Sequence, residues 1–126
     1  MLKIISRSVV LMAAFGLSGV AVADHYSEVW TCTLEDDKTV EDVQAVNTIW
    51  LAYVHANISE EITSSVVTAV VGNLEDFVFV DTYPDLETWA ATKSRLDSDE
   101  ADEIDELFED VSECSKNRLY KSETSK

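Results

Sequence analysis

The order in which two apolar periodicities alternate along the chain most restricts its fold. Residues 28–34 alternate between the two sides of an extended segment, as a β-strand with β-branched residues does. Residues 39–56 instead repeat their apolar side chains at helical spacing, after Thr39 and Asp42, which form a capping-box pattern. The chain therefore starts its folded part with a strand followed by a long helix.

The same two signals continue to the end of the chain. Gly72 and Asn73 mark a hairpin turn, and Pro84 ends the strand after it. The expected elements are strands over 28–34, 62–71, 77–83 and 117–121, and helices over 39–56, 86–96 and 101–111. This β-α-β-β-α-(α)-β order belongs to the α+β class. It is the split βαβ arrangement of ferredoxin-like folds, with a four-stranded antiparallel sheet.

Residues 1–23 have the character of a secretory signal peptide. Lys3 and Arg7 precede an apolar stretch that ends in the small-x-small pattern at 21–23. A membrane anchor is the alternative, but the stretch is interrupted by glycines and is shorter than the roughly 20 residues that a spanning helix needs. We expect cleavage after Ala23, export to the periplasm or the medium, and a single domain over 24–126. Cleavage would leave 103 of the 126 residues and change the net charge from −16 to −18, because only two positive charges are removed.

Cys32 and Cys114 are the two cysteines of the chain. In an oxidising compartment an even pair indicates a disulfide. A redox-active or metal-binding pair is the alternative, but CxxC spacing and a nearby histidine are missing. In a ferredoxin-like fold the first and last strands are antiparallel neighbours. That arrangement brings the end of the first strand close to the start of the last, so topology and disulfide support each other.

The acidic composition excludes two classes of partner. With 9 Lys and Arg against 25 Asp and Glu, the chain lacks the cations that displace counterions from a phosphate backbone, so no nucleic acid is expected. An anionic membrane surface is disfavoured for the same reason, and no membrane contact is expected after cleavage. From 97 to 113, ten of seventeen residues are acidic, and their spacing leaves an apolar helical stripe intact. We interpret this segment as a solvated helix face.

Three segments carry a resemblance to a known superfamily. They are Val-Trp-Thr-Cys-Thr-Leu at 29–34, Asn47-x-x-Trp50, and Phe-Val-Asp-Thr-Tyr-Pro-Asp-Leu-x-x-Trp at 79–89. In these segments the chain resembles the dimeric α/β-barrel superfamily, which includes antibiotic-biosynthesis-type monooxygenases and stress-responsive barrel proteins. The resemblance covers nearly all of the expected mature chain and implies two ferredoxin-like subunits packed sheet to sheet. Members include cofactor-free oxygenases, haem enzymes, isomerases and proteins with no known reaction, so it does not fix the activity.

Asn47 is the most informative candidate site residue, because it lies on an otherwise apolar helical face. A buried amide must be hydrogen-bonded, either to backbone at the sheet edge or to a ligand in a cleft above the sheet. Some cofactor-free oxygenases of the resembled superfamily use Asn and Trp to hold an aromatic substrate. We expect a mostly apolar cleft between the first helix and the sheet. Its candidate ligand-binding residues are Asn47, Trp50, Trp30, Tyr83 and Trp89.

Other polar residues give weaker signals. Lys93 falls between apolar helix positions, as a lysine whose stem covers apolar surface or as a cation that faces an acidic ligand. His55 is expected to be exposed beside the core, and His25 to be a solvated histidine near the mature terminus, where a copper site is the alternative. Two histidines provide too few ligands for a multi-histidine metal site and no convincing ligand for a haem, so neither a cofactor nor a metal is expected. No catalytic residue is assigned, because no Ser-His-Asp set, Cys-His set, phosphate loop or zinc signature is present.

Three functional hypotheses remain. The first is a protein that binds a small apolar or aromatic molecule. The second is a cofactor-independent oxygenase on the same scaffold, and the third is a stress or interaction protein whose cleft is filled by its own side chains. In each case we expect a homodimer, because helices cover one sheet face while residues 77–80 offer apolar side chains to both faces.

Overall fold

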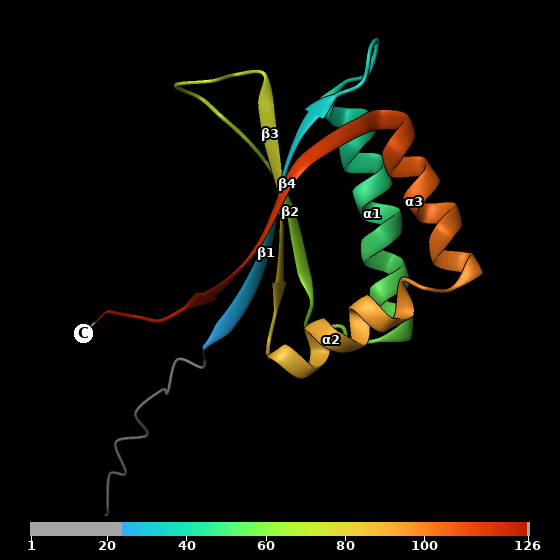
Figure 1. The fold of residues 1–126 in the computed structure, drawn as a ribbon, viewed down its shortest axis with the longest axis vertical. Helices are drawn as coiled ribbons and strands as arrows, with labels where there is room; N and C mark the ends of the chain where they lie inside the picture. The colour runs from blue at the N-terminus through green and yellow to red at the C-terminus, as the bar shows by residue number, and fades with distance from the viewer. Residues whose placement is uncertain (1–23, 126) are drawn as a thin grey trace, which may run out of the picture.

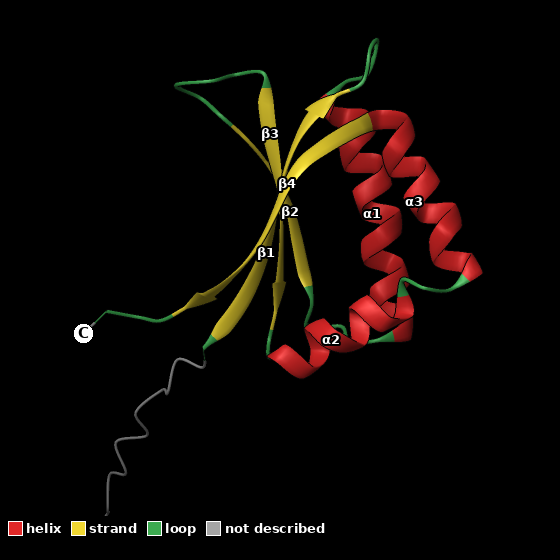
Figure 2. Ribbon diagram, in the orientation of Figure 1, coloured by secondary structure: helices red, strands yellow, loops and turns green. Residues whose placement is uncertain are grey.

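The computed structural model describes residues 24–125 and has the expected order of elements (Figures 1 and 2). The elements are β1 (His25–Leu34), α1 (Val40–Asn57), β2 (Thr63–Thr68), β3 (Asp76–Tyr83), α2 (Leu86–Arg95), α3 (Asp99–Val111) and β4 (Ser112–Ser122). The strands form one sheet in the order β2-β3-β1-β4, and every pair of neighbours is antiparallel. This is the ferredoxin-like topology that the sequence predicts. The predicted signal peptide, 1–23, lies outside the described residues.

Each helix begins at a capping residue. Thr39 and Asp42 form the predicted capping box of α1. Asp85 accepts a hydrogen bond from the amide of Thr88 at the start of α2, and Ser98 accepts one from the amide of Ala101 at the start of α3. Because each first turn is satisfied by its own cap, the helix starts need no contact with the sheet.

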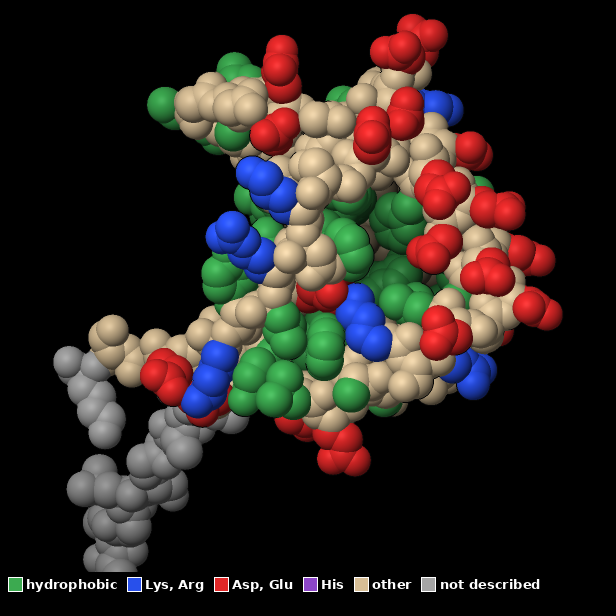
Figure 3. Space-filling view, viewed as in Figure 1, with side chains coloured by type: hydrophobic (Ala, Val, Ile, Leu, Met, Phe, Trp, Pro, Cys, Tyr) green, Lys and Arg blue, Asp and Glu red, His purple; other side chains and the backbone are tan. Residues whose placement is uncertain are grey.

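All three helices lie on one side of the sheet, and the other face carries no helix (Figure 1). Helices α1 and α3 run side by side across the sheet, and α2 crosses below them. Helix α3 buries Ala101, Ile104 and Val111 and turns its acidic side chains outward, as Figure 3 shows on the right. The uncovered sheet face presents half-buried valines of β1 and β3 and the exposed Val67 of β2. Among the helices of the described residues, none is long and apolar enough to cross a membrane.

Two strands differ in length from the prediction. The predicted strand 62–71 ends at Thr68, and Val70 and Val71 are about nine-tenths exposed in the following loop, 69–75. Their β-branched side chains favour extended backbone but have no apolar face to pack against here. The last strand, predicted as 117–121, extends over 112–122, because nearly its whole length pairs with β1. Because its side chains are mostly polar, this strand shows no alternation of apolar residues in the sequence.

Strand β4 is an edge strand with basic side chains in an acidic protein. Lys116 and Arg118 lie on the uncovered sheet face, in a shallow groove that also includes Val29, Thr31 and Tyr120. Lys121 pairs with Asp24 and Glu123 near the end of the strand. Charged side chains along an edge strand discourage further strand addition.

The predicted disulfide joins β1 to β4 at a register position of the sheet. Cys32 lies opposite Cys114, next to an irregularity in the β1–β4 pairing, and the two are bonded across a sequence separation of 82 residues. Cys32 is 1% exposed and packs in a core cluster with Val43, Phe77 and Phe79. The bond therefore holds an edge strand with little apolar surface of its own to the centre of the sheet.

We expect the double variant Cys32→Ser/Cys114→Ser to unfold at lower urea concentration than the parent protein. A bond that closes so long a loop restricts the unfolded chain, and removing it costs roughly 2–5 kcal/mol. Equilibrium unfolding followed by tryptophan fluorescence measures the difference. The parent protein in a strong thiol reductant should behave like the double variant, and an unchanged unfolding midpoint after verified reduction would contradict the prediction.

Candidate functional site

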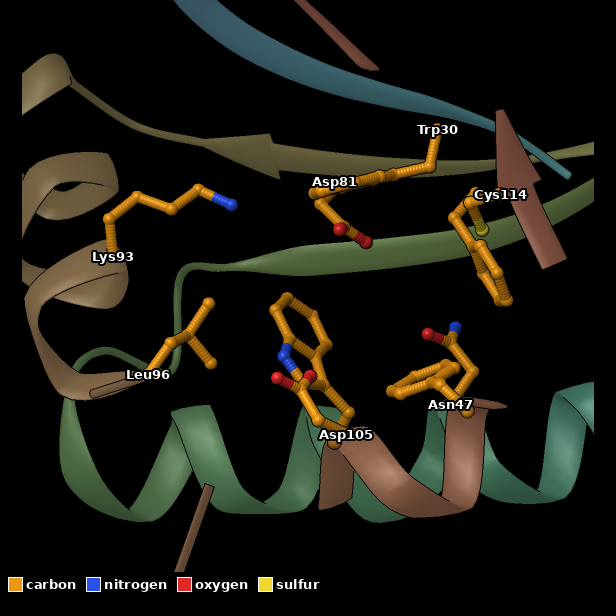
Figure 4. A pocket seen from close by; sticks show the side chains of 10 residues that line it. Trp30, Asn47, Asp81, Lys93, Leu96, Asp105 and Cys114 are labelled. Atoms are coloured by element: carbon orange, nitrogen blue, oxygen red, sulfur yellow. The ribbon is translucent and has the colours of Figure 1, made fainter. Parts of the chain in front are cut away.

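A cleft of about 140 Å³ lies between α1 and the helix-covered face of the sheet. It appears in Figure 3 as the hollow between the sheet and the acidic helix α3. Every helix and three of the four strands contribute to its wall. The lining residues are Trp30, Asn47, Trp50, Phe79, Asp81, Lys93, Leu96, Asp105, Phe108 and Cys114 (Figure 4). The wall is mostly apolar and aromatic, with a small number of polar groups that could orient a ligand.

Three of the five predicted ligand-binding residues line this cleft, namely Trp30, Asn47 and Trp50. Tyr83 and Trp89 do not line it, which corrects their predicted place. Tyr83 is further along β3 and packs with Val54 and Ile62 in a second core cluster, where it is 1% exposed. Trp89 turns its indole N–H away to a buried carboxylate.

Glu28 is that carboxylate, and it is 2% exposed at the centre of the sheet. Three donors from two elements reach it. The indole N–H of Trp89 donates to Oε2 at 3.3 Å, and the amide of Asn117 donates to Oε1 at 2.7 Å. The ammonium of Lys93 lies 2.6 Å from Oε2. Burial of a carboxylate is tolerated when its charge and its lone pairs are matched in this way.

Lys93 combines two contacts at the border of the cleft. Besides its ion pair with Glu28, its ammonium lies 5.2 Å from the centre of the Trp30 ring, as in a cation–π interaction. The acidic group that Lys93 faces is a carboxylate of the protein itself, whereas the sequence had suggested a stem that covers apolar surface or a cation that faces an acidic ligand. Its side chain is 29% exposed and lines the cleft.

A second polar chain starts at Asn47. The Asn47 amide nitrogen donates to the Ser64 hydroxyl at 2.9 Å, and that hydroxyl donates to Oδ1 of Asp81. The amide is therefore paired to a side chain of β2 rather than to the backbone. Because the serine has one proton and Asp81 is the better acceptor, the order of donation runs from Asn47 through Ser64 to Asp81.

Asp81 is 7% exposed and directly faces Glu28 in the register of β1 and β3. Burial raises the pKa of the Asp81 carboxyl to about 6; the Ser64 hydrogen bond and Lys93 lower the pKa, and the negative Glu28 raises it. In the described part of the chain, Ser64 is the one hydrogen-bond donor to this carboxylate. In Figure 4 the Asp81 carboxylate points into the cavity.

Two other groups near the site have perturbed titration. Burial raises the pKa of Tyr83, whose hydroxyl lacks a hydrogen-bond partner in the described residues. Partial burial and the neighbouring Asp102 and Glu109 raise the pKa of Asp105, which lines the outer wall of the cleft on α3. Carboxylates thus surround Lys93 on several sides.

Sequence analysis missed Glu28, Ser64 and Asp81. The signal was present, since Asp81 shares its strand face with Phe77, Phe79 and Tyr83, and Glu28 shares one with Trp30 and Cys32. What was missing is the pairing register, which places Ser64, Asp81 and Glu28 in one row across three strands. A period-2 pattern gives the face of a side chain but not its neighbour on the next strand.

The histidines lie away from the cleft. His55, expected to be exposed, is half-buried, and its Nε2 lies 2.6 Å from the carbonyl oxygen of Ile62. His25 is exposed at the start of β1. Over residues 24–125, no group of three or more His, Cys, Asp or Glu side chains is placed to hold a metal ion.

Comparisons with known proteins support the fold. No family model and no curated protein sequence matches the chain. Among solved structures, the chain is similar to SnoaB, a cofactor-independent oxygenase from Streptomyces nogalater, with 12% identity and a TM-score of 0.58, over 82% of this chain and 97% of that one. It is also similar to a dimeric protein of unknown function and ferredoxin-like fold from Bacteroides fragilis, with 14% identity and a TM-score of 0.45, over 79% and 96% of the two chains. At 12% identity the likeness to SnoaB concerns the fold.

We expect Asp81→Asn to stabilise the protein at about pH 7.5 and to change little at about pH 3.5, below the ordinary pKa of the carboxyl. The folded-state pKa of about 6 lies above the ordinary value of 3.8, so the contribution of Asp81 to stability is largest at low pH and is lost as the pH rises through 6. The asparagine can still accept from Ser64 and never ionises. The gain at high pH should be on the order of 1–3 kcal/mol.

Thermal melts at both pH values measure this difference. Asp102→Asn removes the same charge from the exposed side of α3 and serves as the control. An equal shift of the melting temperature at both pH values for Asp81→Asn would show that folding does not raise the pKa of Asp81.

Proposed function

We propose that this protein binds a small aromatic or apolar molecule in the cleft between α1 and the sheet. The observation that carries the proposal is that the cleft beside Asn47 is open, with two indoles and a buried carboxylate in its wall. A side-chain-filled site, as in a non-catalytic stress or interaction protein, would leave no such volume. A cavity of about 150 Å³ accommodates one benzene ring in a well-studied model protein, so about 140 Å³ suits a single-ring ligand.

A cofactor-independent oxygenase is the second candidate, and two observations favour it. The fold matches that of SnoaB, which is described as such an oxygenase. Asp81 lies in the cleft wall with a pKa of about 6, so its carboxylate form is available near neutral pH to accept a proton from a substrate. Turnover of an aromatic compound without added cofactor separates this candidate from binding alone.

Export and self-association complete the proposal. The signal-like segment 1–23 and the Cys32–Cys114 disulfide support an exported protein, since such bonds persist in oxidising compartments. The uncovered sheet face supports a homodimer. There Val29 of β1 lies opposite Val80 of β3, and Val78 lies two residues before Val80 on the same strand face. A second copy of the chain would cover these three valines.

Benzyl alcohol, a neutral single-ring probe, should shift the indole N–H signals of Trp30 and Trp50 in NMR spectra and leave that of Trp89 nearly unchanged. The first two indoles line the cleft, whereas the third is held by Glu28 outside it. Single Trp→Phe variants assign the three signals. Equal shifts of all three, or none up to the solubility limit of the probe, would contradict a ligand site in this cleft.

The exported protein should have, in native mass spectrometry, the mass of two chains of residues 24–126, each with one disulfide. Because the net charge of −18 opposes association, the dimer should tighten as salt increases. Val78→Glu places a charge on the uncovered face and should produce monomers, whereas Val70→Glu in the exposed loop should not. A monomeric mass of the parent protein at high concentration and moderate salt would end the dimer proposal.

A further inference from the structure

We propose that the ligand of the cleft is a single-ring aromatic amine in its protonated form, with its ammonium group against Asp81 and its ring against Trp50. This inference rests on the proposed function, because it assigns a chemical class to the molecule that the same cleft binds. It follows from two carboxylates that lie side by side in the sheet and are matched unequally.

The first carboxylate, Glu28, already holds a cation. Lys93 places its ammonium between Oε2 of Glu28, at 2.6 Å, and the ring of Trp30, whose centre is 5.2 Å away. A buried carboxylate and an indole together stabilise an ammonium through an ion pair and a cation–π interaction. At this end of the cleft, a buried carboxylate and an indole therefore already bind an ammonium group, that of Lys93.

The second carboxylate, Asp81, repeats half of that arrangement. It faces Glu28 in the strand register, it is 7% exposed, and it points into the cavity (Figure 4). Ser64 donates one hydrogen bond to it, and no described cation pairs with it. A carboxylate has about four acceptor positions, so a buried Asp81 with one donor is under-matched for its charged form.

The groups that face Asp81 from the surrounding elements favour a cation over other ligands. Glu28 on β1 and Lys93 on α2 act on the charge of Asp81, and Asp105 on α3 also lines the cleft. Lys93 is the one basic residue among the lining residues. With Lys93 matched by Glu28, the remaining carboxylates give the cleft a net negative charge. An anionic ligand would be repelled, and a neutral one would leave the charge of Asp81 unmatched.

The aromatic side chains of the cleft favour a ligand whose remaining part is an aromatic ring. Trp50 enters from α1 on the side of the cleft opposite the sheet, and Phe79 and Phe108 add apolar surface, so a ring packs between apolar walls while its substituent reaches Asp81. A volume of about 140 Å³ suits one ring with a short side chain.

The test compares three probes of the same size: benzylamine, benzyl alcohol and benzoate. Their affinities for the wild-type protein are measured by NMR titration at about pH 7.5 and constant ionic strength. We expect benzylamine to bind about tenfold more tightly than benzyl alcohol, the ratio that a charge-assisted hydrogen bond produces, and benzoate to bind least. If none of the three binds, the proposed function fails together with this inference. If benzyl alcohol or benzoate binds as tightly as benzylamine, the cleft is a ligand site but the amine is wrong.

Two variants locate the ammonium. Asp81→Asn should remove the preference for benzylamine, so that the variant binds benzylamine and benzyl alcohol with affinities within about twofold of each other. Asp102→Asn changes the net charge equally, lies on the exposed side of α3, and should keep the preference. A preference retained in Asp81→Asn would place the amine elsewhere and overturn the proposal.

The pH profile of the wild-type protein gives a second test that needs no variant. An alkylamine stays protonated between about pH 5 and 7.5, whereas Asp81 takes up its proton near pH 6. The preference for benzylamine should therefore fall several-fold at the lower pH, while the affinity for benzyl alcohol holds. A preference that is constant over this range would contradict an ion pair with Asp81.

Discussion

The buried charge of Glu28 is the constraint on which the arrangement around the sheet depends. A carboxylate at the middle of β1 with 2% exposure is tolerable only if donors are brought to it. Two of them, Trp89 and Lys93, are four residues apart and so lie on one face of α2. The contact helps to fix the rotation of this short helix, whose C-terminal end is held to α1 by the hydrogen bonds from Arg95 to Tyr53 and Asn57.

The same contact shapes the cleft. Because Lys93 is drawn to Glu28, its stem and Leu96 close one end of the cavity, and its ammonium lies beside Trp30. The Asn47–Ser64–Asp81 chain ties α1 to β2 and β3 on the other side. These polar contacts therefore tie α1 and α2 to the sheet on two sides of the cleft.

Interactions between residues close in the sequence allowed most of the fold to be predicted. The caps at Thr39, Asp85 and Ser98 needed only neighbouring residues, and the order of elements gave the topology. Strand β4 was underestimated because its pairing depends on β1 and the disulfide rather than on its own apolar pattern. The site was half predicted: Trp30, Asn47 and Trp50 follow from helix and strand faces, whereas the Asp81–Glu28 pairing depends on a register between strands 53 residues apart.

The placement of charge on opposite sides of the molecule has a consequence for how it orients in an electric field. Helix α3 carries an acidic face on one side, and β4 carries Lys116, Arg118 and Lys121 on the other (Figure 3). A single subunit is therefore a strong dipole superimposed on its net negative charge. If two subunits join by their uncovered sheet faces about a two-fold axis, the dipole components perpendicular to that axis cancel. The basic strands then gather near the middle of the pair, and the outer surfaces that meet other molecules are the acidic helices.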